Sequence, residues 1–238
     1  MSFTENPYQS PSYSFAAQAA ADERSEFIAK TYLHLAGAIG AFVLLEAVLL
    51  NLPGIEGIVG TIFRMQYGWL MVLGGFILVS WLAESWARSA ISTTTQYMGL
   101  GLYVVAESII FVPLLFIANK QDPNIIPTAG IATLGLFSIL TAIVFITRKD
   151  FSFMRTFLMF AGFAAMGIIM AAIFTGFALG PIFTMAMIAF ACAYILYDTS
   201  NVMHHYRIGQ HVAAALALFA AVALLFWYVV RLVMASRD

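Results

Sequence analysis

A small group of titratable side chains ends the sixth apolar stretch of the chain. Asp198 is the first charged residue after Arg155, and His204 and His205 follow within about two helical turns. A carboxylate can bind a cation or exchange a proton, and histidine can sense pH or ligate a metal. Because adjacent helical residues diverge by about 100°, His204 and His205 are poorly placed to share one ion. We therefore expect either pH sensing or an ordinary polar loop here, and no metal site.

Three glutamates stand alone within other apolar stretches. Glu107 lies deepest in its stretch, whereas Glu46 and Glu84 lie nearer the ends of theirs. An isolated carboxylate in apolar surroundings is costly unless it is paired or hydrogen-bonded. For Glu107 two interpretations stay open, a protonated carboxyl bonded to a neighbouring helix and a group in a water-filled path. For Glu46 and Glu84 the alternative to such a path is snorkelling or pairing near an interface.

Composition shows which elements must carry these groups. Of 238 residues, 62% are hydrophobic and only 10% are charged, against about half and a quarter in ordinary soluble domains. The sequence therefore predicts an integral membrane protein. The net charge of −1 provides no general attraction for nucleic acid, and the single cysteine, Cys192, excludes intrachain disulfides and thiolate metal sites.

Apolar windows of about 20 residues predict the spanning helices. We expect an all-α protein with seven of them, at about 28–50, 67–87, 96–118, 126–147, 154–176, 179–198 and 212–232. Residues 1–26 are predicted to be a disordered or interfacial tail, and 27–238 the seven-helix transmembrane domain. No soluble domain interrupts the short connections.

The distribution of Lys and Arg predicts the orientation. With the N-terminus inside, the inner side holds seven of them and the outer side four: inner Arg24, Lys30, Arg88, Arg148, Lys149, Arg155 and Arg207, outer Arg64, Lys120, Arg231 and Arg237. We expect a cytoplasmic N-terminus, with Asp198 and the histidine loop facing the cytoplasm.

Several kinds of chemistry are missing from the sequence. A retinal protein needs a Schiff-base lysine in the last span, but the final lysine is Lys149, in a loop. The sequence has neither the His-Glu-x-x-His of metalloproteases nor a Gly-x-Ser-x context suited to an intramembrane serine protease. We therefore predict no enzyme activity and no cofactor.

Four segments together resemble the Bax inhibitor-1 (TMBIM) family, in its bacterial type. They are FIAKTYLHLAGAIGAFVLL (27–45), TRKDFSFMRTFL (147–158), AYILYDTSN (193–201), and LALF (216–219) followed by Arg231. The resemblance implies six helices around a central seventh in a bacterial plasma membrane. It also implies a link to passive calcium leak and to suppression of stress responses.

The resemblance also implies an aspartate pair, of which only Asp198 is present. The seventh-span partner falls on Ala221, and a nearby family asparagine falls on Leu224. Two close carboxylates can share a proton and sense pH, so we expect pH gating through Asp198 to be weak or absent. Arg88 is the predicted counter-ion, forming an ionic lock at the cytosolic end.

Two functions stay open at this point. One is a passive cation leak, with calcium as the candidate ion and Asp198, Arg88, Glu107 and Glu84 in the ion path or its gate. The other is a non-conducting modulator of other membrane proteins, such as a quality-control protease. The missing second aspartate and the polar N-terminal tail favour the second.

Overall fold

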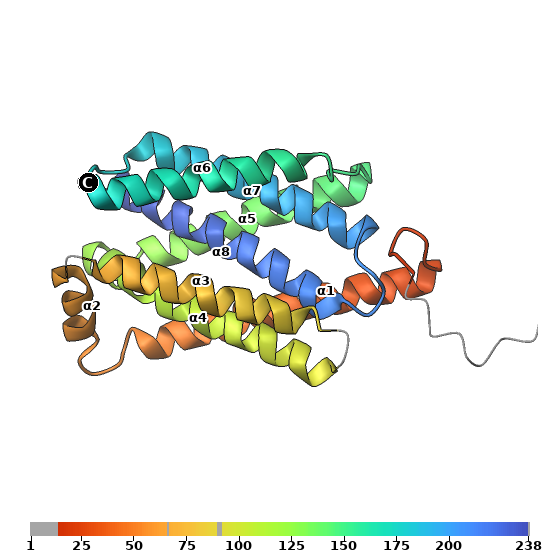
Figure 1. Ribbon diagram of the computed structural model, residues 1–238, viewed down its shortest axis with the longest axis horizontal. Coiled ribbons are helices and arrows are strands. Elements are labelled where there is room, and N and C mark those ends of the chain that lie inside the picture. Colours follow the sequence, from red (N-terminus) through yellow and green to blue (C-terminus); the bar gives the residue numbers. More distant parts are fainter. Residues whose placement is uncertain (1–13, 66, 90–91, 238) are drawn as a thin grey trace, which may run out of the picture.

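The computed structural model describes residues 14–65, 67–89 and 92–237 of the chain. This part is helical and contains no named strand (Figure 1). Its helices are α1 (Ala21–Leu49), α2 (Ile55–Arg64), α3 (Gly68–Ala87), α4 (Thr93–Gln121), α5 (Ile125–Thr147), α6 (Met154–Thr175), α7 (Pro181–His204) and α8 (His211–Ala235). All but α2 are long and apolar enough to cross a membrane. The predicted all-α fold with seven spans is confirmed.

The short helix α2 was not predicted. It follows the Asn-Leu-Pro-Gly turn, where Gly54 takes the left-handed conformation with φ of 85°. With ten residues it is too short to span a bilayer. It packs against α3 and α4, with Val59 buried in the contact. A window of about 20 residues, chosen to find membrane spans, is too long to detect an apolar helix of this length.

The N-terminal segment is tied to the loop between α7 and α8. Ala16 donates a backbone hydrogen bond to the Tyr206 carbonyl at 2.8 Å, and Ile208 donates one to the Ser14 carbonyl at 3.0 Å. The Arg207 guanidinium lies over the Phe15 ring, 5.4 Å from its centre. Residues 1–13 of the predicted tail lie outside the described residues. The remainder of that tail is attached to the bundle, and α1 already begins at Ala21.

Helix α7 continues beyond the predicted end of its span at residue 198. It runs to His204, so Asp198 lies inside the helix and not at its C-terminus. The Asp-Thr-Ser-Asn sequence can start a turn by bonding its own backbone. Here Asp198, Thr199 and Ser200 are buried against neighbouring segments instead, and the backbone stays helical.

Helix α8 lies in the interior and α6 at the periphery. In the most apolar window of α8, 72% of residues are buried, against 6% in that of α6. The sequence AAALALFAAVALL supplies α8 with small residues on several faces, which lets neighbouring helices come close. Accordingly α8 packs against α1, α3, α4, α5 and α7 (Figure 1). The finer arrangement, six helices around the seventh, stays a prediction.

Large apolar side chains cover the outside of the bundle. Examples are Ile182, Ile146 and Phe153, which are 89%, 81% and 76% exposed. A soluble protein would bury such side chains, whereas lipid tails solvate them. The exposed surface therefore suits contact with the lipid bilayer.

The backbones of α3 and α4 approach each other closely at Gly99. A Cβ atom added there would lie 2.5 Å from both the Ala83 carbonyl oxygen and the Ala87 amide nitrogen. Glycine is thus required by the close approach of two backbones. The contact fixes the end of α3 that carries Glu84 and leads to Arg88.

Candidate functional site

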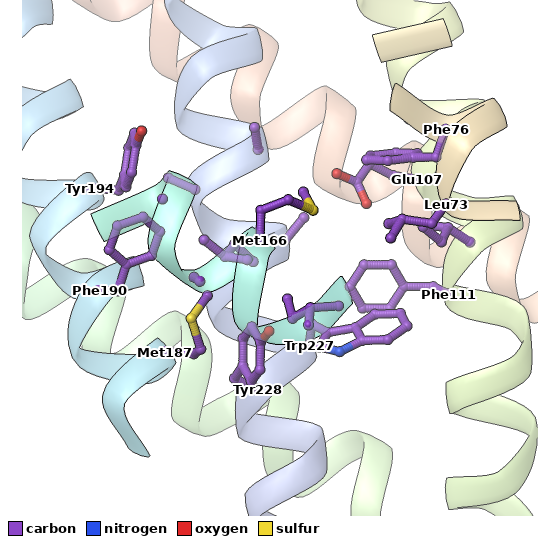
Figure 2. Close-up of a pocket in the computed structure, with 18 of the residues that line it drawn as sticks. Leu73, Phe76, Glu107, Phe111, Met166, Met187, Phe190, Tyr194, Trp227 and Tyr228 are labelled. Carbon is purple, nitrogen blue, oxygen red and sulfur yellow. The ribbon is translucent and has the colours of Figure 1, made fainter. Parts of the chain in front are cut away.

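A cavity of about 840 Å³ opens between α3, α4, α6, α7 and α8. Figure 2 shows Glu107 and Phe111 of α4 on one side of this space and Phe190 and Tyr194 of α7 on the other. Helix α6 packs on α7 and forms the cavity wall with residues such as Met166. The volume falls within the range of ligand-binding clefts.

Five charged side chains from four helices line this cavity: Glu84, Arg88, Glu107, Asp198 and Arg231. The rest of the lining is mainly apolar and aromatic. Asp198 and Glu107 are 8% and 6% exposed. The four ion-path candidates from the sequence therefore share one cavity, although they come from three separate segments of the chain. Their role stays a prediction.

At one end of the cavity, Arg88 pairs with Glu84. Arg88 Nη2 lies 3.4 Å from Glu84 Oε2, one helical turn back. The ion pairs among the described residues do not include the direct Arg88–Asp198 contact that the sequence predicted. Asp198 instead interacts with the Asn201 side chain, and the charges of Arg88 and Glu84 both act on it. The arrangement is a cluster of two acids and one arginine.

The second acid beside Asp198 comes from α3 and not from α8. Ala221 and Leu224, where the family resemblance led us to look for an aspartate and an asparagine, both line the same cavity. Glu84 lines the same cavity from α3 and acts on Asp198 through its charge. The sequence did not predict that Glu84 acts on Asp198, because Glu84 lies more than a hundred positions earlier in the chain.

Tyr206 lies partly buried near this cluster, in the loop after α7. Burial, and then the negative charge of Asp198, raises the pKa of Tyr206 well above its ordinary value. The phenol therefore stays neutral at physiological pH and adds no charge to the cluster. Nothing in the local sequence marks Tyr206 as part of the site.

Glu107 lines the cavity from the middle of α4. Its carboxyl points into the space (Figure 2) and interacts with Tyr103, one turn earlier on α4. Among the ion pairs of the described residues, none involves Glu107. This placement fits either of the two interpretations of Glu107, a carboxyl bonded to its neighbours or a group in a path.

Arg231 lies at the far end of the cavity, near the end of α8. Its Nη2 donates to the Leu179 carbonyl at 3.0 Å, and its guanidinium lies 5.8 Å from the centre of the Tyr228 ring. The hydrogen bond joins α8 to the turn between α6 and α7. A positive charge thus lies at the end opposite Glu84 and Asp198.

The two candidate histidines differ in their surroundings. His205 Nε2 lies 3.0 Å from Asp150 Oδ2, in the loop between α5 and α6. The His204 Nε2 atom is buried without a hydrogen-bond partner in the described part of the chain. Their ring centres lie 6.2 Å apart. Among the described residues, no group of three or more His, Cys, Asp or Glu could hold a metal ion.

Asp150 organises the loop that meets α7. Its Oδ1 accepts the Ser152 amide at 2.8 Å, and the buried Ser200 hydroxyl accepts the Phe151 amide at 2.9 Å. Burial alone would raise the pKa of the Asp150 carboxyl. The hydrogen bonds from Ser152 and His205 outweigh that effect and lower the pKa to about 2. The Asp-x-Ser spacing was a signal for the turn, but the partners on α7 were not predictable.

A further polar group joins α1, α4 and α8. His34 Nε2 lies 3.0 Å from the Tyr97 hydroxyl, and the His34 and His211 rings lie 4.9 Å apart. The partners of His34 come from distant parts of the chain, so this group could not be assembled from the sequence.

Comparisons with known proteins cover nearly all of the chain. Residues 24–238 match the model of a family described as "Inhibitor of apoptosis-promoting Bax1". The chain is also 26% identical over 224 residues to "Bax inhibitor 1" from the fission yeast Schizosaccharomyces pombe. That match covers 92% of this chain and 80% of the yeast protein.

Proposed function

Because the chain belongs to the Bax inhibitor-1 family of multi-pass membrane proteins, we propose that it is a passive cation leak. The resemblance seen in four sequence segments is confirmed at the level of the family. The proposal adds calcium as the cation and the cavity of about 840 Å³ as the route. It also places the N-terminus in the cytoplasm, on the basis of the Lys and Arg distribution.

The observation that carries the proposal is three carboxyl groups in one cavity of a membrane bundle. Glu84 and Asp198 stand at one end, and Glu107 lines the cavity from the middle of α4. Acids within a membrane are costly and mark ion or proton paths when they face a bundle interior. Oxygen is also the ligand that calcium prefers. Successive carboxyls give a cation more than one stopping point along the route.

Two arginines and several aromatic side chains of the same cavity would keep it closed to ions. Arg88 neutralises Glu84 beside Asp198, and Arg231 holds the other end through its bond to Leu179. Aromatic side chains such as Phe111 and Trp227 project into the cavity and narrow it (Figure 2). In the proposed cycle, opening requires Arg88 to leave the two acids, so that a cation can take its place.

Calcium efflux from loaded liposomes containing the purified chain tests the proposal. We expect flux above that of empty vesicles, and a fall of roughly tenfold in Asp198→Asn or Glu107→Gln, the effect of about 1.4 kcal/mol on a barrier. Arg88→Gln is expected to raise the flux. The control is Glu56→Gln, an acid outside the cavity that lies 3.9 Å from Lys120 and is expected to leave flux unchanged.

Measurements at pH 6 and pH 8 separate the leak from its alternative. Flux equal to that of empty vesicles at both values would refute conduction and leave the non-conducting modulator of other membrane proteins. Equal effects of Glu56→Gln and Glu107→Gln would refute the cavity as the route.

A further inference from the structure

A second cavity of about 290 Å³ lies between α1, α4, α5 and α8. It is on another side of α8 from the first cavity, and its walls include Phe42, Leu115 and Phe226. Val43 of α1 and Leu134 of α5 also line it, and they are 56% and 47% exposed. The cavity therefore reaches the apolar outer surface between α1 and α5, where a molecule dissolved in lipid could enter.

One acid lies inside this apolar cavity. Glu46 is 5% exposed, and neither of its carboxyl oxygens has a hydrogen-bond partner among the described residues. The sequence suggested snorkelling or interfacial pairing for Glu46, but the side chain is enclosed and unpaired. Leaving a buried carboxyl without a partner costs free energy, and such groups in folded proteins point to a missing water, ion or ligand.

A hydroxyl with the same lack of partner faces the same space. Thr133 is 2% exposed and its Oγ1 has no hydrogen-bond partner in the described part of the chain. Elsewhere on α5, the Ser138 hydroxyl donates to the Leu134 carbonyl one turn back, at 2.7 Å. Thr133 does not use that option, so its oxygen remains available inside the cavity.

The number of unpartnered atoms selects the chemistry of a ligand. The cavity presents three acceptor oxygens, two on Glu46 and one on Thr133, and none of its lining residues is Lys, Arg or His. An alcohol has one hydrogen to donate, whereas an ammonium group has three and no acceptor. A primary amine, once protonated, is therefore the simplest head group that carries one hydrogen for each of the three oxygens.

The remaining lining selects an apolar tail of limited size. Beyond the polar end, the walls are aliphatic and aromatic, including Ile39, Leu50 and Ile126. With about 30 Å³ for each water-sized group, the cavity takes a chain of roughly ten such groups. We propose that this cavity binds a primary alkylamine from the lipid phase, with its nitrogen on Glu46 and Thr133. The amine enters in its neutral form and meets a protonated Glu46 carboxyl, whose proton then passes to the nitrogen to give an ammonium–carboxylate pair.

Photolabelling with a decylamine that carries a diazirine near the end of its chain tests this proposal. The purified full chain in detergent micelles is irradiated with the probe, and labelled peptides are mapped by mass spectrometry. We expect labels on the apolar lining of the cavity, away from the Glu46 and Thr133 side chains that hold the nitrogen, displaced by decylamine but not by decane. Glu46→Gln is expected to reduce labelling roughly tenfold, the loss of a charge-assisted hydrogen bond.

A pair of glycine variants tests whether the cavity itself is needed. Gly130 lines the cavity on α5, and a Cβ built there meets nothing within 4 Å. Gly130→Leu is expected to fill the space and abolish labelling while the carboxyl remains. Gly135 on the same helix also has open space around its Cβ position but does not line the cavity, so Gly135→Leu is the matched control.

Three results would overturn the proposal. One is labelling spread over the lipid-facing surface and insensitive to Glu46→Gln. Another is equal loss of labelling in Gly130→Leu and Gly135→Leu. The third is displacement of the label by decanol as effectively as by decylamine, which would show that any hydrogen-bond donor binds and that the site does not select an amine. A thermal-unfolding measurement on each variant establishes that the chain is folded.

Discussion

Replacing Gly99 by alanine is expected to loosen the contact between α3 and α4. The new Cβ atom would lie 2.5 Å from the Ala83 carbonyl oxygen and the Ala87 amide nitrogen. It would also lie 3.0 Å from the Trp86 Cβ atom. These distances are well short of 3.4 Å, where ordinary contact begins. Two of the three neighbours are backbone atoms, so the helices themselves must separate.

The size of the effect follows from two opposing contributions. Overpacking of a close contact costs about 1–3 kcal/mol, while the greater helix propensity of alanine returns at most about 1 kcal/mol. We expect a net loss of up to about 2 kcal/mol in the free energy of unfolding. Gly101, on the same helix, has nothing within 4 Å of its Cβ position. Gly101→Ala therefore gains the propensity without the clash.

Unfolding of the purified chain by increasing the fraction of SDS in mixed micelles measures both variants. Tryptophan fluorescence is a suitable signal, because Trp86 lies in the contact. The difference between Gly99→Ala and Gly101→Ala isolates the steric cost, since the propensity contribution is common to both. If the two variants unfold within about 0.5 kcal/mol of each other, below the cost of overpacking, the close approach of α3 and α4 is refuted.

Three more predictions use the same unfolding measurement. Ser200→Ala is expected to cost about 1–3 kcal/mol, because the Phe151 amide loses its acceptor. Asp150→Asn is expected to cost less than about 1 kcal/mol at pH 7, because its pair with a histidine is half exposed. Folding lowers the pKa of Asp150 to about 2, so this stabilisation is present above the ordinary pKa of the carboxyl and is lost as pH falls through about 2. The unfolding free energies of wild type and Asp150→Asn, plotted against pH, should therefore converge near pH 2. A difference between them that widens on acidification would contradict the assignment. Arg231→Met is expected to cost about 1–3 kcal/mol by leaving the Leu179 carbonyl without its donor, and an unchanged midpoint would contradict it.

The sequence predicted the existence of the spans better than their ends. Apolar length alone decides whether a helix can cross a bilayer, and all seven such helices are present. Helix ends depend on caps and on tertiary partners. At the start of α4 the Ser92 side chain accepts the Thr95 amide at 3.4 Å, a local signal visible in the sequence. At the end of α7 the Asp198 segment stays helical because neighbours bury it, which no local signal reveals.

The candidate site was predictable in its membership but not in its pairings. The cost of a charge in an apolar stretch pointed to Glu84, Glu107 and Asp198, and all three face one cavity. Whether Arg88 pairs with Glu84 or with Asp198 depends on changes of about an ångström or two in the distance between helices, because an ion pair needs its charged atoms within about 4 Å. The same limit applies to Glu46, whose enclosure depends on the spacing of α1, α5 and α8. Sequence periodicity says nothing about that spacing.

Two backbone hydrogen bonds, Ala16 to Tyr206 and Ile208 to Ser14, attach the N-terminal segment to the loop between α7 and α8. A change in the position of this segment would therefore move that loop. A protein that binds this segment from outside the bundle would act directly on the connection between α7 and α8. Those two helices carry Asp198 and Arg231, at opposite ends of the large cavity. A displacement of this N-terminal segment would thus be transmitted to both ends of the large cavity without any partner entering the bilayer.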